Sequence, residues 1–415
     1  MSESPSPSAT PPVDGPVLMV SSSFPRWHGD AAGHFVARLA GALVECGVAV
    51  RALVPHEAGA ARRETLAGVE VTRLRYFRPE RLQRLAYGSG VPANLRRRPV
   101  AWLNLPFFLA AFLGAIARSG DRHRLVHAHW GVLGALAVLT RPVHRRPVVV
   151  TVHGSDLHPE VAPLGVRRLT RLAIRRADAV LTPSAAFERE CRTIGARDSR
   201  FLPHGVDSPD ASRLAEVLAA RWERAERGVP LRLVTVGRLV PERRHDLLLA
   251  ALAGVAPTEG GSELVVVGEG PERRRIEERA RALAPACSVQ LVGQVAPDSI
   301  QELLAGADLY VSATSVETFG LATVEAAGCA LPIVATAVGY PAELLGPDAA
   351  RLVPVADVAS LRAAIEGLSS DASTRLTLGH RARDRFDRAE LSWARAAERT
   401  AAVYRELLER DHGHG

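Results

Sequence analysis

Short apolar runs alternate with longer helix-forming segments along almost the whole chain, and this alternation constrains the fold more than any other feature. The runs form two successive series, at residues 17–23, 48–55, 69–74, 125–129, 148–153, 179–182 and 201–202, and at residues 231–236, 263–267, 289–292, 309–312 and 333–336. Apolar runs joined by helical crossovers are typical of parallel strands that helices cover on both faces. We therefore expect an α/β protein with two doubly wound domains and a cleft between them.

The two series also predict the domain boundaries. The first domain is expected over residues 17–207 and the second over 230–386, with the polar stretch 208–229 as a linker that includes a helix. A long helical pattern at about 387–408 follows. Residues 1–16 are rich in Ser and Pro and lack an apolar run, so we expect a disordered tail there and no signal peptide or anchor.

Composition excludes several classes of enzyme. All 52 basic side chains are arginines, because the sequence contains no lysine. Schiff-base enzymes, ordinary P-loop ATPases and kinases with an ATP-binding lysine are therefore ruled out. The net charge of +7 is spread along the chain without a nucleic-acid-binding motif, so we expect no nucleic-acid partner. Anionic substrates, an anionic membrane or a solvated surface all account for the charge.

The four cysteines are far apart, which argues against disulfides and a zinc ribbon and favours a reducing, cytoplasmic location. Two segments leave membrane contact open. Residues 100–117 carry no charge and are long enough to span a bilayer, but we favour a buried crossover helix, then surface contact, then a span. Residues 166–176 place an arginine stripe either toward solvent, which we favour, or toward anionic lipid at the inner membrane face: Arg167, Arg171 and Arg175.

The most informative segment for chemistry is Glu-Thr-Phe-Gly-Leu-Ala-Thr-Val-Glu at residues 317–325, which follows a predicted strand. A helix is expected to begin near Gly320, and the free N–H groups of a helix start suit a pyrophosphate. Glu317 ahead of the helix and Glu325 inside it can accept hydrogen bonds from sugar hydroxyls. Taken alone, this spacing fits an ordinary helix with surface glutamates better.

The neighbouring strand ends favour a ligand site. Guanidinium groups suited to a diphosphate follow the first strand of the second domain, and glycines that permit tight turns or close ligand approach follow the next two. The motifs are Gly237-Arg238 with Arg243-Arg244, Gly268-Glu-Gly270-Pro271 and Val292-Gly293.

Together these motifs resemble the retaining GT-B glycosyltransferases of family 4, the "glycosyl transferases group 1" family, over nearly the whole chain after residue 16. The order and spacing of further matches add to the resemblance: residues 24–33, His127-Ala-His129-Trp130, Val152-His153-Gly154-Ser155-Asp156, Pro203-His204-Gly205-Val206-Asp207, and Ala337-Val-Gly339 with Glu343. The resemblance implies a GT-B fold, in which two Rossmann-like domains face a cleft and the C-terminal helix crosses back to the first domain.

The resemblance also implies a role for each matching residue. Arg238 and Arg243 would clamp the diphosphate of a nucleoside diphosphate sugar, and Glu317 would hold donor-sugar hydroxyls. His153 would approach the sugar near its anomeric carbon or its 6-hydroxyl. The other donor-binding positions would be Gly33, whose loop would close on the donor or the acceptor, Gly237, Gly268, Val292, Gly293, Phe319, Gly320, Leu321 and, on the ribose, Glu325. Asp156 and His129 are the candidate acceptor contacts.

The chemistry implied is retaining sugar transfer without a metal or cofactor, the nucleotide sugar being a co-substrate. The acceptor would be a polysaccharide, a lipid-linked glycan or a small natural product. His127 and His129 point to one face of a strand but have no third metal ligand at suitable spacing, and no Asp-x-Asp motif is present. Two alternatives stay open: another GT-B enzyme such as a sugar-nucleotide epimerase, and a non-catalytic protein that binds sugar nucleotides.

The sequence departs from the family pattern at several positions. The family usually has Lys where Arg243 stands and often Gly where Arg244 and Ala330 stand. A glycine pair is usual where this chain has Ala32-Gly33, and Asn is usual where it has His204. The loop change puts the contacts of Gly33 in question.

Overall fold

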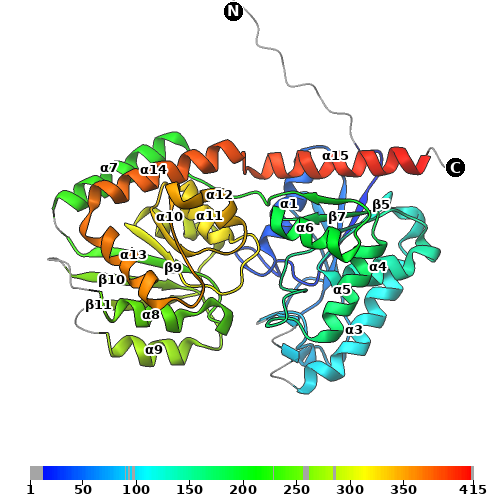
Figure 1. Ribbon diagram of the computed structural model, residues 1–415. Coiled ribbons are helices and arrows are strands. Elements are labelled where there is room, and N and C mark those ends of the chain that lie inside the picture. Colours follow the sequence, from blue (N-terminus) through cyan, green and yellow to red (C-terminus); the bar gives the residue numbers. More distant parts are fainter. Residues whose placement is uncertain are drawn as a thin grey trace, which may run out of the picture.

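The computed structural model describes residues 13–88, 90–91, 94–95, 99–227, 229–255, 261–283 and 287–412. Of the tail expected at 1–16, residues 1–12 lie outside the described residues. Figure 1 shows two α/β domains side by side, with two C-terminal helices along the top, residues 372–389 over the second domain and 393–412 over the first.

The first domain is built on an eight-stranded sheet with the strand order β3-β4-β2-β1-β5-β6-β7-β8. All its neighbouring strands are parallel except the β3–β4 pair. The strands are β1 (Val17–Val20), β2 (Val50–Pro55), β3 (Arg63–Leu66), β4 (Val69–Leu74), β5 (Leu125–His129), β6 (Val148–Thr151), β7 (Ala179–Thr182) and β8 (Ser199–Phe201).

Helices cover both faces of this sheet. Leu18 and Val20 of β1 face a core shared with α3, α4, α5 and α6, whereas Val17 and Met19 face a core shared with α1 and α15. Burial on both faces explains why the central strands are apolar without alternation. The helices are α1 (His34–Glu45), α3 (Pro99–Ala117), α4 (Gly131–His144), α5 (Leu164–Arg176) and α6 (Ala185–Ile194), with the short 3-10 helices η1 (Glu80–Leu82) and η2 (Gly120–Arg122).

The second domain has a six-stranded parallel sheet with the order β11-β10-β9-β12-β13-β14. Its strands are β9 (Leu231–Val236), β10 (Ser262–Val267), β11 (Cys287–Gly293), β12 (Leu309–Ser312), β13 (Ile333–Thr336) and β14 (Arg351–Val353). Its helices are α8 (His245–Leu252), α9 (Arg273–Arg281), α10 (Ile300–Ala305), α11 (Leu321–Gly328), α12 (Gly339–Ala349), α13 (Val358–Ser370) and α14 (Ala372–Ala389), with η3 (Pro241–Arg243) and η4 (Pro297–Ser299).

Two helices follow the points where the chain passes from one domain to the other. Helix α7 (Ala211–Glu226), within the segment expected as a linker, packs on the second domain, because buried Arg221 donates hydrogen bonds to the carbonyl groups of Leu304, Ala307 and Cys329 at 2.8–3.0 Å. Helix α15 (Trp393–His412) crosses back and packs on α1, with Tyr404 fully buried in the first domain. The crossing predicted for the C-terminal helix is confirmed.

Helix α3 contains the charge-free segment 100–117. It is the one described helix that is long and apolar enough, by length and composition, to cross a membrane. Ala101, Asn104, Phe108 and Phe112 are buried on one face of α3, while the other face is exposed. The expected buried crossover helix is therefore buried on one side only.

Candidate active site

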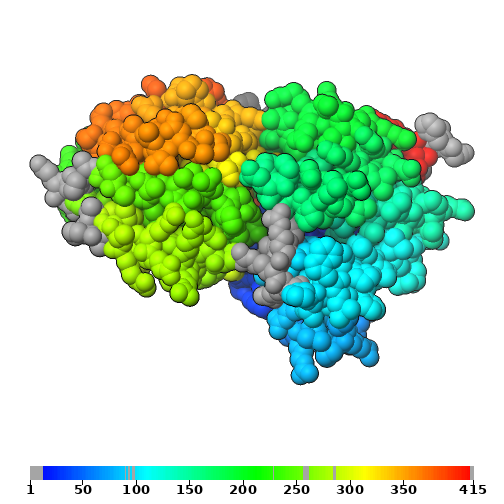
Figure 2. Space-filling model, turned by 60° about the horizontal axis from the view of Figure 1, so that its bottom comes forward, coloured from blue at the N-terminus to red at the C-terminus, as the bar shows by residue number. Residues whose placement is uncertain are grey.

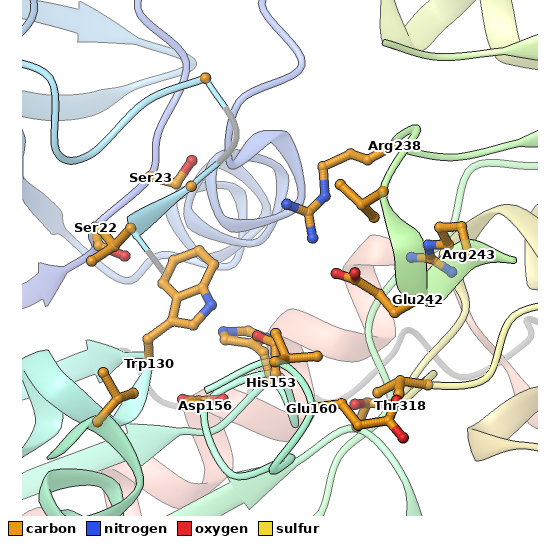
Figure 3. A pocket seen from close by; sticks show the side chains of 18 of the residues that line it. Ser22, Ser23, Trp130, His153, Asp156, Glu160, Arg238, Glu242, Arg243 and Thr318 are labelled. Carbon is orange, nitrogen blue, oxygen red and sulfur yellow. The ribbon is translucent and has the colours of Figure 1, made fainter. Parts of the chain in front are cut away.

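A cavity of about 1310 Å³ lies between the two domains, at the carboxyl ends of strands from both sheets. The loops after β1, β6, β9 and β12 form much of its wall, and Figure 3 shows several of the side chains. Most of the residues proposed from the sequence meet here: Gly33, His153, Asp156, Arg238, Arg243, Glu317, Phe319, Gly320 and Leu321 all line the cavity.

The two arginines reach the cavity from the loop after β9. The guanidinium group of Arg238 points into the cavity in Figure 3, and burial followed by the neighbouring charge of Arg243 lowers its pKa. Arg243 forms an ion pair with Glu317, whose carboxylate raises the pKa of Arg243. The carboxylate of Glu242 also acts on both arginines, so what suits an anionic ligand here is the pair of guanidinium donors rather than an excess of positive charge.

Glu317 is held at the start of helix α11. Its Oε1 accepts a hydrogen bond from the Thr318 N–H at 3.0 Å, while its other oxygen faces Arg243. Gly320, just before the helix, adopts a left-handed backbone with φ 67°, and a Cβ there would lie 2.5 Å from Pro341. Because only glycine fits this turn, the first N–H groups of α11 are presented at the cavity wall.

Other proposed donor-binding residues lie behind this wall. Within the described chain, Gly237, Gly268, Val292, Gly293 and Glu325 are not among the residues that line the cavity. The Gly268 N–H donates to the Gly293 carbonyl at 2.8 Å, and a Cβ on Gly268 would lie 2.0 Å from the Gly237 oxygen. These glycines let neighbouring strand ends approach each other.

Glu325 is buried in α11, and desolvation followed by the nearby charge of Asp207 raises its pKa to about 8. The carboxyl group is therefore largely protonated at neutral pH. A buried acid of this kind is common at ligand sites, although structural networks also produce it.

His153 follows β6 and stands in a row of rings. It stacks on His129 and His204 with centroids 5.4 Å away in each case, and Phe35 meets it edge-on at 5.1 Å. Burial, with the adjacent imidazoles adding to it, lowers the pKa of His153 well below its usual value. The ring is thus neutral at physiological pH.

His129 lies behind His153 and does not itself line the cavity within the described residues; its Nδ1 is 3.2 Å from Nε2 of His153. Further back, His127 contacts the Tyr404 hydroxyl at 2.6 Å and the Thr151 hydroxyl at 2.7 Å. No role was predicted for Tyr404, which is far away in the chain and is indicated only by its place in the apolar stripe of the last helix.

Gly33 occupies the loop before α1 with φ 62°, and a Cβ there would lie 2.2 Å from the Ser23 carbonyl oxygen. Of the Ala32-Gly33 pair, the glycine therefore stands where the backbone requires it.

Asp156 is fully buried beside His153 (Figure 3). Its Oδ2 accepts a hydrogen bond from the Gly131 N–H at 2.7 Å, whereas Oδ1 has no hydrogen-bond partner among the described residues. Burial raises the pKa of this carboxyl group. Asp156 thus keeps a buried carboxylate oxygen without a hydrogen-bond partner, within the described chain, on the first-domain side of the cavity.

The sequence missed several lining residues, among them Ser22, Ser23 and Thr318. Thr318 lies so close to the loop after β6 that a Cβ on Gly154 would be 1.8 Å from its hydroxyl oxygen. Such contacts between domains leave no local signal in a sequence. Among the described residues, no group of three or more His, Cys, Asp or Glu side chains is arranged to hold a metal ion.

Two family models match this chain, one on each domain. The "Glycosyl transferase 4-like domain" matches residues 31–205, and "Glycosyl transferases group 1" matches residues 219–385. The chain belongs to the glycosyl transferases group 1 family. The matched regions contain all the strands of both sheets except β1, so this glycosyltransferase has its family's two domains in order.

Similar proteins agree with the family. Glycogen synthase of Mycobacterium tuberculosis strain H37Rv is 27% identical over 297 residues, which cover 68% of this glycosyltransferase and 69% of the relative. Sucrose-phosphate synthase from Thermosynechococcus elongatus superposes with a TM-score of 0.76 at 23% identity, over 95% and 100% of the two chains. Anabaena HepE, solved with UDP-glucose, superposes with a TM-score of 0.69 at 17% identity, over 94% and 99%. The two superpositions confirm the predicted GT-B fold.

Proposed function

We propose that this glycosyltransferase moves a sugar from a nucleoside diphosphate sugar to an acceptor hydroxyl with retention of the anomeric configuration. The observation that carries the proposal is the grouping of Arg238, Arg243 and Glu317 around one cavity at the start of α11. UDP-glucose, with which the structure of HepE was solved, is the donor to test first.

The proposed mechanism follows from where charge develops. When the nucleoside diphosphate leaves, negative charge grows on its β-phosphate, and Arg238, Arg243 and the N-terminus of α11 stabilise that charge. We propose that these groups make a divalent cation unnecessary. Addition of a chelator should then leave turnover unchanged, whereas lost activity that Mg²⁺ restores would refute this part of the proposal.

Retention requires either a covalent intermediate or attack from the face of the leaving group. We propose same-face attack assisted by the departing phosphate. Glu317 is paired with Arg243 on the phosphate side, which suits hydroxyl binding better than nucleophilic attack. A trapped glycosyl-enzyme would contradict this mechanism.

The substitution Glu317→Ala tests the site. We expect turnover to be lost while the protein stays folded, because the donor sugar loses its hydroxyl contact and the ion pair with Arg243 disappears. Glu278→Ala, at a half-exposed position on α9 of the same domain, is the matched control and should behave as wild type. Unchanged turnover in Glu317→Ala would refute the site, and donor binding without transfer to any acceptor would favour a non-catalytic protein.

A further inference from the structure

The first-domain wall of the cavity is divided between polar loops and apolar helices. His153, Ser155 and Asp156 come from the loop after β6, and Ser22 and Ser23 from the loop after β1. The helices contribute a different surface: the lining residues of α3 and α5 are Trp102, Leu105, Phe108, Leu109, Gly165, Val166, Arg168 and Leu169. Arg168 is the one charged side chain that these two helices place there, within the described chain.

This division suits an acceptor that is polar at one end and apolar at the other. A glycan carries hydroxyl groups along its whole length. Each hydroxyl that lost its hydrogen bonds to water without gaining a protein partner would make binding less favourable. The α3–α5 wall offers few partners, whereas an acyl or prenyl chain would gain about 0.8 kcal/mol for each methylene it buries. At the polar end, Asp156 lines the cavity, and its buried Oδ1 has no hydrogen-bond partner among the described residues, so an acceptor hydroxyl would satisfy it.

Helix α3 continues this apolar surface out of the cavity. Trp102 lines the cavity and is also 57% exposed. Beyond it, an exposed stripe with helical spacing runs along α3, and we call it the α3 ridge: Leu103, Pro106, Phe107, Ala110 and Leu113. The outward face of a helix in a soluble protein normally carries polar residues, so an exposed face this apolar indicates contact with a lipid or protein surface.

The charge beside the α3 ridge indicates which surface it meets. Helices α3 and α5 both pack on α4, and they lie on the same side of the molecule in Figures 1 and 2. On α5, Arg168, Arg171 and Arg175 are exposed at helical spacing, and no ion pair of Arg168 or Arg171 is found among the described residues. Aromatic and aliphatic side chains flanked by arginines match the interface of a bilayer with anionic headgroups.

We propose that the acceptor is a membrane amphiphile: the α3 ridge and the α5 arginines rest on an anionic bilayer, and the acceptor's apolar chain lies along the α3–α5 wall with its hydroxyl at Asp156 and His153. This rests on the proposed function, since it names the acceptor class of the same site. Trp102 joins the two surfaces, so the acceptor reaches the donor without crossing water.

The bilayer contact is tested by sedimentation with vesicles of phosphatidylcholine alone and of phosphatidylcholine with phosphatidylglycerol. Wild type should bind the anionic vesicles more tightly, and Leu103→Ser with Phe107→Ser should weaken that binding by roughly tenfold or more. Trp222→Ser with Val355→Ser changes exposed apolar residues of the second domain and should have no effect. The proposal would be overturned if wild type did not bind the vesicles, or if the control pair weakened binding as much as the α3 pair. It would also be overturned if the chain formed a dimer that only Leu103→Ser with Phe107→Ser abolished.

The acceptor chain is tested with methyl, octyl and dodecyl glucosides below their micelle concentrations. The affinity of the protein for these glucosides should rise with the length of the alkyl chain, by up to about fourfold per methylene. Leu109→Ser should reduce this dependence on chain length. UDP, GDP, ADP and dTDP are titrated into the same samples. If one of these nucleotides binds but the length of the alkyl chain has no effect on affinity, the proposal of an amphiphilic acceptor is refuted and the proposed function stands. If none of them binds, the proposed function itself fails.

Discussion

Arg243 has two partners, Glu317 and the proposed donor phosphate. It pairs with Glu317 and lines the cavity where the donor phosphates are proposed to bind. Arg243→Lys keeps the charge, so appreciable activity should remain, although the bidentate geometry is lost. Arg243→Ala should lower kcat/KM by roughly tenfold or more, the scale of one charged hydrogen bond.

Steady-state kinetics on purified variants check this prediction, with thermal unfolding measured alongside because the alanine also leaves Glu317 without its ion pair. Arg274→Ala, whose side chain is 90% exposed on α9, is the charge-matched control. Wild-type kinetics in Arg243→Ala would show that this position does not bind the donor.

Glu325 should make stability depend on pH. Its pKa is about 8 in the folded protein against an ordinary 4.5, so the folded state holds a proton that the unfolded state releases between these values. The free energy of unfolding should therefore fall as pH rises from about 5 to 8, by at least about 1 kcal/mol relative to Glu325→Gln. Urea unfolding of both proteins across this range measures the difference. A constant or rising difference would mean that the carboxyl group is already ionised when folded.

Among single residues, the sequence indicated the lining arginines, Glu317 and His153 because their motifs follow strand ends. It could not indicate that Arg243 and Glu317 form an ion pair, since they are 74 residues apart. The buried Oδ1 of Asp156, unpaired within the described chain, likewise could not be predicted, because its burial is created only by the folded loops.

At the level of elements, two departures from the family pattern fall at strained turns. Arg244 and Ala330, where the family often has glycine, adopt φ of 50° and 48°. Ala330 closes helix α11 in a Schellman motif: its N–H donates to the Ala327 carbonyl at 3.0 Å, and the Leu331 N–H donates to the Ala326 carbonyl at 3.0 Å. Glycine is the residue that this motif favours.

Ala330→Gly should therefore stabilise the protein by about 1 kcal/mol, because glycine adopts a positive φ without the Cβ clash. Ala326→Gly makes the same chemical change in the interior of α11 and should have the opposite effect, destabilising by about 1 kcal/mol or more. Denaturant unfolding of the two variants tests the pair. Destabilisation by both would show that the methyl packing of Ala330 outweighs its backbone strain.

Most strands of both sheets could be predicted, because burial on both faces leaves a continuous apolar run. Strands β3 and β14 were not predicted: β3 is an edge strand with charged, alternating residues, and β14 is a three-residue edge strand. Helix α3 shows a further limit, since a segment apolar on every side does not reveal which face will be exposed.

At the scale of the whole molecule, a carboxylate of the second domain accepts hydrogen bonds from the first domain. Glu343 of α12 accepts hydrogen bonds from the Ala185 and Ala186 N–H groups at 2.9 and 2.8 Å, at the start of α6. The positive end of the α6 dipole strengthens this contact. No local pattern in the sequence predicts it, because it depends on how the two domains are oriented.

Glu343→Ala should loosen the arrangement of the domains. We expect a larger radius of gyration by small-angle scattering and a kcat about fivefold lower, the effect of losing about 1 kcal/mol of charge-assisted hydrogen bonding. Glu278→Ala again serves as the control. An unchanged radius and rate would show that the remaining contacts between the domains suffice.

The central claim is that the cavity between the domains binds the diphosphate of a sugar nucleotide through its arginines. Calorimetric titration with UDP, GDP, ADP and dTDP tests it most directly, in wild type, Arg238→Ala and the control Arg274→Ala. We predict that at least one nucleotide binds wild type and the control equally, and that Arg238→Ala weakens its binding by roughly tenfold or more. Binding of no nucleotide, or undiminished binding by Arg238→Ala, would contradict the claim.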